Sequence, residues 1–167
     1  AFSHIEVKEN AEVRSLTSLE LNDATLTTSG SSRAYLNIKA DDFQFTSTDK
    51  AKVKLNIVAT SVTAEISDNT KTDALIYATE AKLDLYQRAG ADIEGTIQNL
   101  ALRIDNNAKF NGKNFTANTC NVIAEMESDV YIDVTESIVS EASGASEVYL
   151  FGNPKITIKR IIDTVKL

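Results

Sequence analysis

The sequence predicts an all-β fold, a single-stranded right-handed parallel β-helix (β-solenoid) of about seven or eight coils. One observation is a repeat of short segments with small or apolar residues at every second position, at 34–38, 53–57, 74–78, 93–97, 130–134 and 148–152, with an imperfect member at 110–114. A second is the near absence of helix signals. Strands that recur about every 20 residues indicate coils that stack to bury a shared core. The handedness of parallel connections makes the right-handed form the default.

Each coil is expected to contain a second strand after the first. Alternating apolar residues recur there at 43–45, 62–66, 83–85, 100–104, 120–126 and 156–158. Polar turns separate the units, at 47–49, 67–70, 105–107 and 127–129. Asn and Asp tolerate left-handed backbone angles, so these turns suit the corners of a solenoid.

Side chains at equivalent positions should stack in columns. Two inward columns are predicted, one of Ala34, Val53, Ala74, Ile93, Phe110, Val130 and Val148, the other of Leu36, Leu55, Ile76, Gly95, Gly112, Ile132 and Leu150. Two outward columns follow, one of Tyr35, Lys54, Leu75, Glu94, Asn111, Tyr131 and Tyr149, the other of Asn37, Asn56, Tyr77, Thr96, Lys113, Asp133 and Phe151.

The length suits one domain over residues 1–167. Within it, residues 1–31 are less regular and should form the first coils or a cap, and residues 146–167 should form a closing coil and tail. The chain opens at Ala1, and a removed leader or a trimmed start would both give this beginning.

Composition excludes several classes of protein. The net charge is −7, which argues against nucleic-acid binding, because that requires clustered Lys and Arg. No apolar run approaches the ~20 residues of a membrane-spanning helix. Cys120 is the only cysteine, so the chain cannot form an internal disulfide.

No catalytic or metal-binding constellation is expected, and no cofactor. The only histidine, His4, lies near the N-terminus, and Cys120 falls at an inward position. Acidic turn segments at 41–42, 68–69 and 105–107 are explained by turn chemistry, since none has the spacing of a known calcium loop. Glu94 and Asp133, about two coils apart, make a poor carboxylate pair for glycoside cleavage.

Aromatic residues give the outer face its most distinctive feature. Tyr77, Tyr131, Tyr149 and Phe151 are predicted to project outward on one face, with Tyr35 further along. Such stripes bind sugar rings or protein partners, because flat apolar rings stack and the Tyr hydroxyl forms hydrogen bonds at the rim. Ordinary stacking between neighbouring strands is the alternative.

The C-terminal half resembles a known family. The segment Ala91-Asp92-Ile93-Glu94-Gly95 is similar to its strand starts, 129–138 is similar to one of its coils, and Ser143-Gly144-Ala145-Ser146-Glu147-Val148-Tyr149-Leu150-Phe151-Gly152-Asn153-Pro154-Lys155-Ile156 is similar to its closing signature. This is the bacterial "putative auto-transporter adhesin, head GIN domain" family, and the resemblance runs from about Ser32 to Leu167. It implies a right-handed parallel β-helix, exported to the bacterial envelope, with no established catalytic residues.

Three hypotheses about function follow. The first is a non-catalytic domain of the cell envelope, periplasm or cell surface, adhesin-like, that binds a glycan or a protein. The second is a structural β-helix that assembles with copies of itself, because open solenoid ends leave unpaired backbone groups. The third is a polysaccharide-active enzyme.

Overall fold

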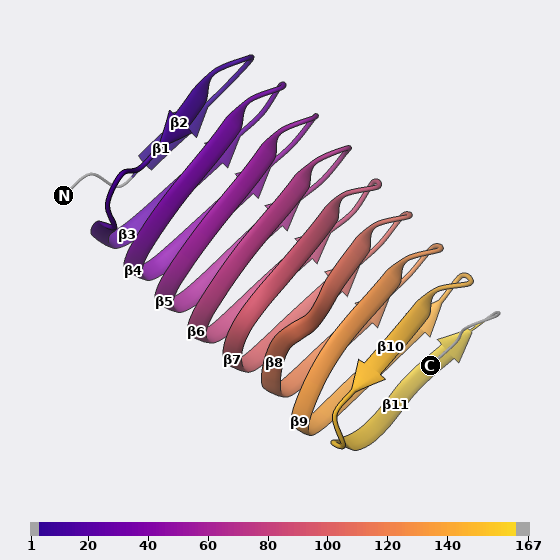
Figure 1. Cartoon of the computed structure of the whole chain (residues 1–167). Helices are drawn as coiled ribbons and strands as arrows, with labels where there is room; N and C mark the ends of the chain where they lie inside the picture. Colours follow the sequence, from indigo (N-terminus) through magenta and orange to yellow (C-terminus); the bar gives the residue numbers. More distant parts are fainter. Residues whose placement is uncertain (1–3, 163–167) are drawn as a thin grey trace.

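The computed structural model describes residues 4–162, which form one eleven-stranded parallel sheet wound into a solenoid of about eight coils (Figure 1). The strands are β1 (His4–Val7), β2 (Glu12–Arg14), β3 (Leu19–Thr28), β4 (Arg33–Ser47), β5 (Lys52–Ile66), β6 (Lys71–Leu85), β7 (Gly90–Ile104), β8 (Lys109–Ala124), β9 (Asp129–Ser143), β10 (Glu147–Phe151) and β11 (Lys155–Ile162). The described residues contain no helix. The predicted β-solenoid is therefore confirmed.

Each long strand from β4 to β9 makes nearly a whole coil. It crosses one face, bends near its middle, at Asp41 in β4 and Thr60 in β5, and returns across the opposite face (Figure 1). We call the layer made by β2, β10 and the first halves of these strands the front sheet, and the layer made by β1, β11 and the second halves the back sheet. The two strands expected in each coil are thus the two halves of one bent strand.

The core lies between these two sheets and follows the alternation of the sequence. Phe43, Leu55, Leu85, Ile104 and Phe110 are among the largest fully buried side chains. Burial of each such side chain stabilises the fold by roughly 1.5–3 kcal/mol. Because the buried residues of successive coils contact one another, the core runs without a break along the solenoid.

The polar turns between successive coils form a second corner of each coil, in addition to the bend within each long strand. Asp49, Asp68, Asn106 and Asn107 all have φ between 55° and 64°, the left-handed region that Asn and Asp tolerate. The carboxylate of Asp49 accepts a hydrogen bond from the Gly30 amide at 2.8 Å, and that of Asp68 accepts one from the Asp49 amide at 3.2 Å. Neighbouring turns are thereby linked, and the predicted role of Asn and Asp at the corners is confirmed.

The register corrects the predicted columns at β6 and β7, and the second outward column also at β8, where Thr116 and not Lys113 pairs with Asp133. Arg33, Lys52, Lys71, Gly90 and Lys109 are paired in sequence, so the spacing is constant from β4 to β8. Ala74 pairs with Leu55, not with Val53, and the first inward column is Ala34, Val53, Thr72, Ala91, Phe110, Val130 and Val148. The prediction favoured apolar residues, but the buried residue of this column in β6 is polar Thr72. A slip of two residues keeps every side chain on its face, so alternation alone could not reveal it.

Candidate ligand-binding site

The front sheet carries a compact group of aromatic rings at its C-terminal end. Tyr131 of β9 and Tyr149 of β10 are paired in register, and their rings stack with centroids 4.5 Å apart and planes 8° apart. Phe151, two residues further along β10, is 43% exposed. With Lys113 these residues form what we call the aromatic cluster: Tyr131, Tyr149, Phe151 and Lys113.

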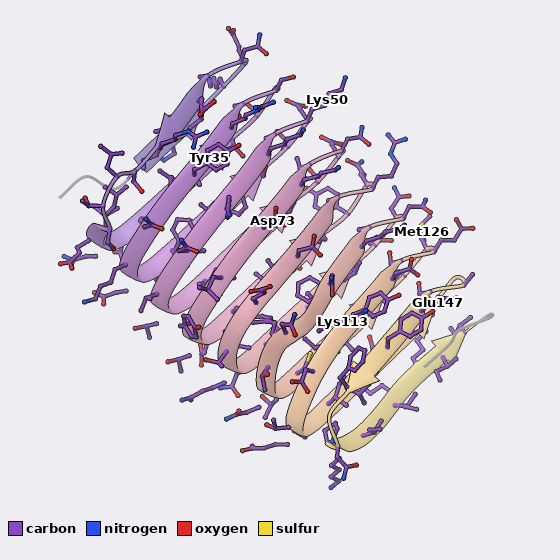
Figure 2. All side chains as sticks on the ribbon, in the orientation of Figure 1. Tyr35, Lys50, Asp73, Lys113, Met126 and Glu147 are labelled. Carbon is purple, nitrogen blue, oxygen red and sulfur yellow. The ribbon has the colours of Figure 1, made fainter. Side chains whose placement is uncertain are left out.

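Lys113 reaches the cluster because β8 contains an irregularity. Opposite β9, the register of β8 shifts between Gly112 and Thr116. Within this segment Phe115 is fully buried, whereas Lys113 is exposed on the front face (Figure 2). Its Nζ lies 4.8 Å from the ring centroid of Tyr131 and 6.0 Å from that of Phe151. A cation over an aromatic face is attracted by the ring quadrupole, so Lys113 is held between two rings.

The Tyr149 hydroxyl is fixed by a neighbour on its own strand. It donates a hydrogen bond to the carboxylate of Glu147, which lies on the same face (Figure 2). This bond raises the pKa of Tyr149 to about 12, with desolvation adding in the same direction. The ring is therefore neutral at physiological pH, oriented, and able to accept a further hydrogen bond at the rim of the cluster.

A groove adjoins the cluster on the front sheet. It has a volume of about 540 Å³ and runs across β6 to β9, ending at Tyr131. We call it the front groove, and its outward side chains are those of Lys71, Asp73, Asp92, Lys109, Asn111, Lys113, Asp129 and Tyr131. Its size lies within the range of small-ligand sites.

Two carboxylates lie side by side in the front groove. Asp73 and Asp92 are paired in register on β6 and β7, with Asn111 next in the same column. Adjacent strands are about 4.8 Å apart, so the two carboxylates are close neighbours. Neither makes a side-chain hydrogen bond or ion pair with another described residue. Sequence reasoning missed this pair because the predicted column placed Leu75 and Glu94 at these positions, two residues out of register.

The other residues predicted for the stripe lie elsewhere. Tyr77 is 46% exposed on β6, and Thr96, Thr116 and Asp133 separate it from Phe151 in its column. Tyr77 is therefore about 19 Å of strand spacing from Phe151 and two strands from Lys113, the member of the aromatic cluster on β8. Tyr35 lies near the opposite end of the front sheet (Figure 2), where the Arg14 guanidinium is 4.2 Å from its ring centroid.

The residues weighed for catalysis are also placed by the structure. Glu94 and Asp133 lie on β7 and β9 in different columns, and Asp133 accepts a hydrogen bond from the Thr116 hydroxyl at 2.8 Å. Cys120 is buried, and burial raises its pKa to about 12, so its thiol stays protonated. Between residues 4 and 162 no three His, Cys, Asp or Glu side chains are grouped to hold a metal ion. Over the same range, no helix has the length and apolar character needed to cross a membrane.

The fold and this surface define the class of protein: a parallel β-solenoid domain with an aromatic cluster beside a polar groove. The chain belongs to the family described as "putative auto-transporter adhesin, head GIN domain", whose family model matches residues 1–154. Searches of the curated proteins and of the solved structures found no match. The family description indicates an adhesin-like domain at the bacterial cell surface. The match includes the N-terminal coils before Ser32, and it ends at Pro154, before β11 begins.

Proposed function

We propose that this domain is a non-catalytic adhesin-like module of the bacterial cell surface or envelope, and that it binds a glycan along the front groove and the aromatic cluster. The observation that carries the proposal is the stacked Tyr131–Tyr149 pair at the end of a groove lined by unpaired carboxylates. Sugar rings present flat apolar faces that stack on aromatic rings, and their hydroxyls form hydrogen bonds with carboxylates and amides. Tyr131 already stacks on Tyr149 and lies under Lys113 Nζ, so Tyr149 and the exposed ring of Phe151 supply the stacking surface, and the front groove supplies the polar partners.

The charges of the front groove favour a neutral or weakly charged glycan. Three lysines, Lys71, Lys109 and Lys113, are matched there by three aspartates, Asp73, Asp92 and Asp129. A highly anionic polysaccharide would face these carboxylates and the net charge of −7 of the whole chain. Neutral hydroxyl-rich chains avoid that repulsion and can use both kinds of side chain, because a hydroxyl both donates and accepts hydrogen bonds.

Tyr77 stays a prediction as a ligand contact. Its exposed ring lies on the front sheet but outside the front groove. Only a ligand long enough to span several coils would contact Tyr77 and the aromatic cluster together.

The test is a panel of bacterial and host polysaccharides incubated with the purified 167-residue chain and read both for binding and for new chain ends. We expect binding to at least one neutral glycan. Tyr149→Ala and Asp92→Asn should each weaken it about tenfold, which corresponds to roughly 1.4 kcal/mol. Tyr77→Ala is the matched control, since it removes an exposed tyrosine from the same sheet, and for a short oligosaccharide its effect should be small.

The remaining outcomes separate the competing functions. New chain ends that disappear in Asp73→Asn would show a polysaccharide-active enzyme, since neighbouring carboxylates about 5 Å apart suit a retaining mechanism. Binding that is unchanged in Tyr149→Ala and Asp92→Asn would move the site away from the front sheet. Absence of any glycan binding would reject the proposal in favour of a protein ligand or self-assembly.

A further inference from the structure

The two ends of the solenoid differ in charge. Among the described residues, the N-terminal end up to β3 is acidic, with Lys8 and Arg14 opposed by Glu6, Glu9, Glu12, Glu20 and Asp23. The strand at the other end, β11, contains no acidic residue and carries Lys155, Lys159 and Arg160. The contrast that bears on a joint is between β1, whose one carboxylate, Glu6, forms an ion pair with Lys8 at 3.0 Å, and β11, which carries three cations.

The basic end also leaves the core open. All eight residues of β11 are exposed, although the strand pairs with β9 in register. Ile156, Ile158 and Ile161 lie above the buried residues Ile138, Ser140 and Ala142 of β9, so they continue inward columns of the core. Their side chains are 45–55% exposed because no described residue covers them. Figure 1 shows β11 as the last strand at this end, with one edge open.

The register of the sheet shows which residues would meet if the solenoid continued. Register partners can be followed from each strand to the next along the sheet. Ile158 of β11 then lies in the same column as Ile5 of β1, and Ile161 lies in the same column as Val7. The column of Arg160 leads to Glu6. A second copy placed with its β1 beside β11 in this register would therefore pair apolar with apolar residues, and would place Arg160 beside Glu6, which already forms an ion pair with Lys8 at 3.0 Å.

We propose that the chain associates head to tail, with β11 of one copy bound to β1 of the next copy as an added parallel strand. The contact satisfies unpaired backbone groups at both edges, covers Ile158 and Ile161, and opposes charges of opposite sign. It uses different surfaces on the two copies, so it does not close on itself and leads to linear rods. This inference is independent of glycan binding, although a rod would repeat the front groove along its length and add avidity.

A symmetric joint of two C-terminal ends is disfavoured by the same charges. Two C-terminal ends facing one another would bring together two sets of Lys155, Lys159 and Arg160. Like charges at an interface oppose association, whereas the head-to-tail joint places Arg160 opposite Glu6.

The joint is limited to the back sheet. The last front strand is β10, which lies in the same coil as β11, and the first is β2, which follows β1 by half a coil. With β1 beside β11, β10 and the β2 of the next copy are separated by the width of one strand. The joint therefore consists of one pair of strands. Small interfaces are typical of weak association, so we expect rods to grow with protein concentration.

The experiment is sedimentation velocity on the full 167-residue chain between about 10 μM and 1 mM, a range that covers weak interfaces. We expect the mean sedimentation coefficient to rise with concentration in low salt and the rise to shrink in high salt, because salt screens exposed charges. A chain that stays monomeric over the whole range would overturn the proposal.

Charge reversal identifies the joint. Arg160→Glu and Glu6→Lys should each abolish the rise, and mixing the two variants should restore it, because each end then again meets an opposite charge. Lys54→Glu on the front sheet is the matched control and should associate like the parent chain. Arg160→Glu and Glu6→Lys are both at exposed positions, so neither should change the melting curve measured by circular dichroism. If Arg160→Glu instead associates more strongly with the parent chain than the parent does with itself, the joint is symmetric and the head-to-tail proposal is wrong.

Discussion

The coils of β4 to β7 and those of β8 to β10 are built on the same plan but differ in regularity. From β4 to β7 the pairing is continuous apart from the bend residues, and equivalent residues are always 19 apart, as in Arg33, Lys52, Lys71 and Gly90. β8 is one residue longer than its neighbours, and its register shifts on both sides. The aromatic cluster lies entirely on the irregular side. The regular coils thus supply an even frame, and the departure from the repeat places Lys113 beside the aromatic rings.

The irregular segment also fills a space that the regular coils leave. Gly95 of β7 is paired with Ile76 on one side and Phe115 of β8 on the other. Gly95 brings no side chain to its inward position, whereas the ring of Phe115 is fully buried. The bulge in β8 therefore turns one residue, Phe115, into the core and another, Lys113, onto the front face.

Among the changes that test this difference between the coils, Phe115→Ala should lower the free energy of unfolding most. Removal of a fully buried aromatic ring costs about 3–5 kcal/mol, because the lost burial is added to the cavity left behind. We expect the free energy of unfolding in urea to fall by that amount. Phe151→Ala is the matched control: its ring is 43% exposed, so the same change should cost about 1 kcal/mol or less. Equal losses in the two variants would contradict this account of the bulge.

Gly95→Ala should rank next. Gly95 has φ of +118°, and a Cβ there would lie 2.0 Å from the carbonyl oxygen of Ile76, so the backbone of β6 must move. We expect a loss of about 2–3 kcal/mol in the free energy of unfolding. Gly90 begins the same strand, and a Cβ added there would meet only the Thr70 carbonyl oxygen, at 4.0 Å. Gly90→Ala should therefore change stability by about 0.5 kcal/mol or less, and a comparable loss there would refute the steric explanation.

The sequence was sufficient for the fold but not for the register. Alternation and the spacing of polar turns identify coils, because each inward residue must find an apolar neighbour in the next coil. They do not distinguish Thr72 from Ala74 as the start of a buried column, since both lie on the same face. The candidate site was likewise predictable where it depends on the repeat and not where it depends on the register. Tyr131 and Tyr149 follow from the spacing of two clear repeats, whereas Asp73 beside Asp92 depends on the register. The position of Lys113 depends on a bulge that the sequence marks only by the imperfect repeat at 110–114 and the glycine within it, Gly112, and neither shows which side chain turns outward.

The stacked tyrosines of the irregular coils allow a smaller energy to be measured, the direct coupling between two side chains. A double-mutant cycle of Tyr131→Leu, Tyr149→Leu and the pair should show a coupling of about 0.5–1.5 kcal/mol, the range for aromatic pairs beyond their buried area. Tyr131→Leu with Tyr77→Leu serves as the control cycle, because Tyr77 is on β6 and does not contact the aromatic cluster. Coupling in both cycles would indicate a general change in the front sheet, not direct stacking.

The smallest effect is expected from titration of Tyr149. Its pKa is about 12, raised from 10.0 chiefly by the hydrogen bond to Glu147. A raised pKa means that the folded state prefers the neutral phenol, so this contribution to stability is complete below about pH 10 and is lost as the pH rises toward 12. Glu147→Gln should lower the pKa of Tyr149 toward 10, visible as earlier growth of tyrosinate absorbance in the near ultraviolet. Glu65→Gln is the matched control, because it removes the carboxylate that accepts the Tyr86 hydroxyl and leaves Tyr149 untouched. If Glu147→Gln leaves the titration unchanged, the hydroxyl is not held by Glu147, and the rim of the aromatic cluster is freer to reorient toward a ligand than its geometry indicates.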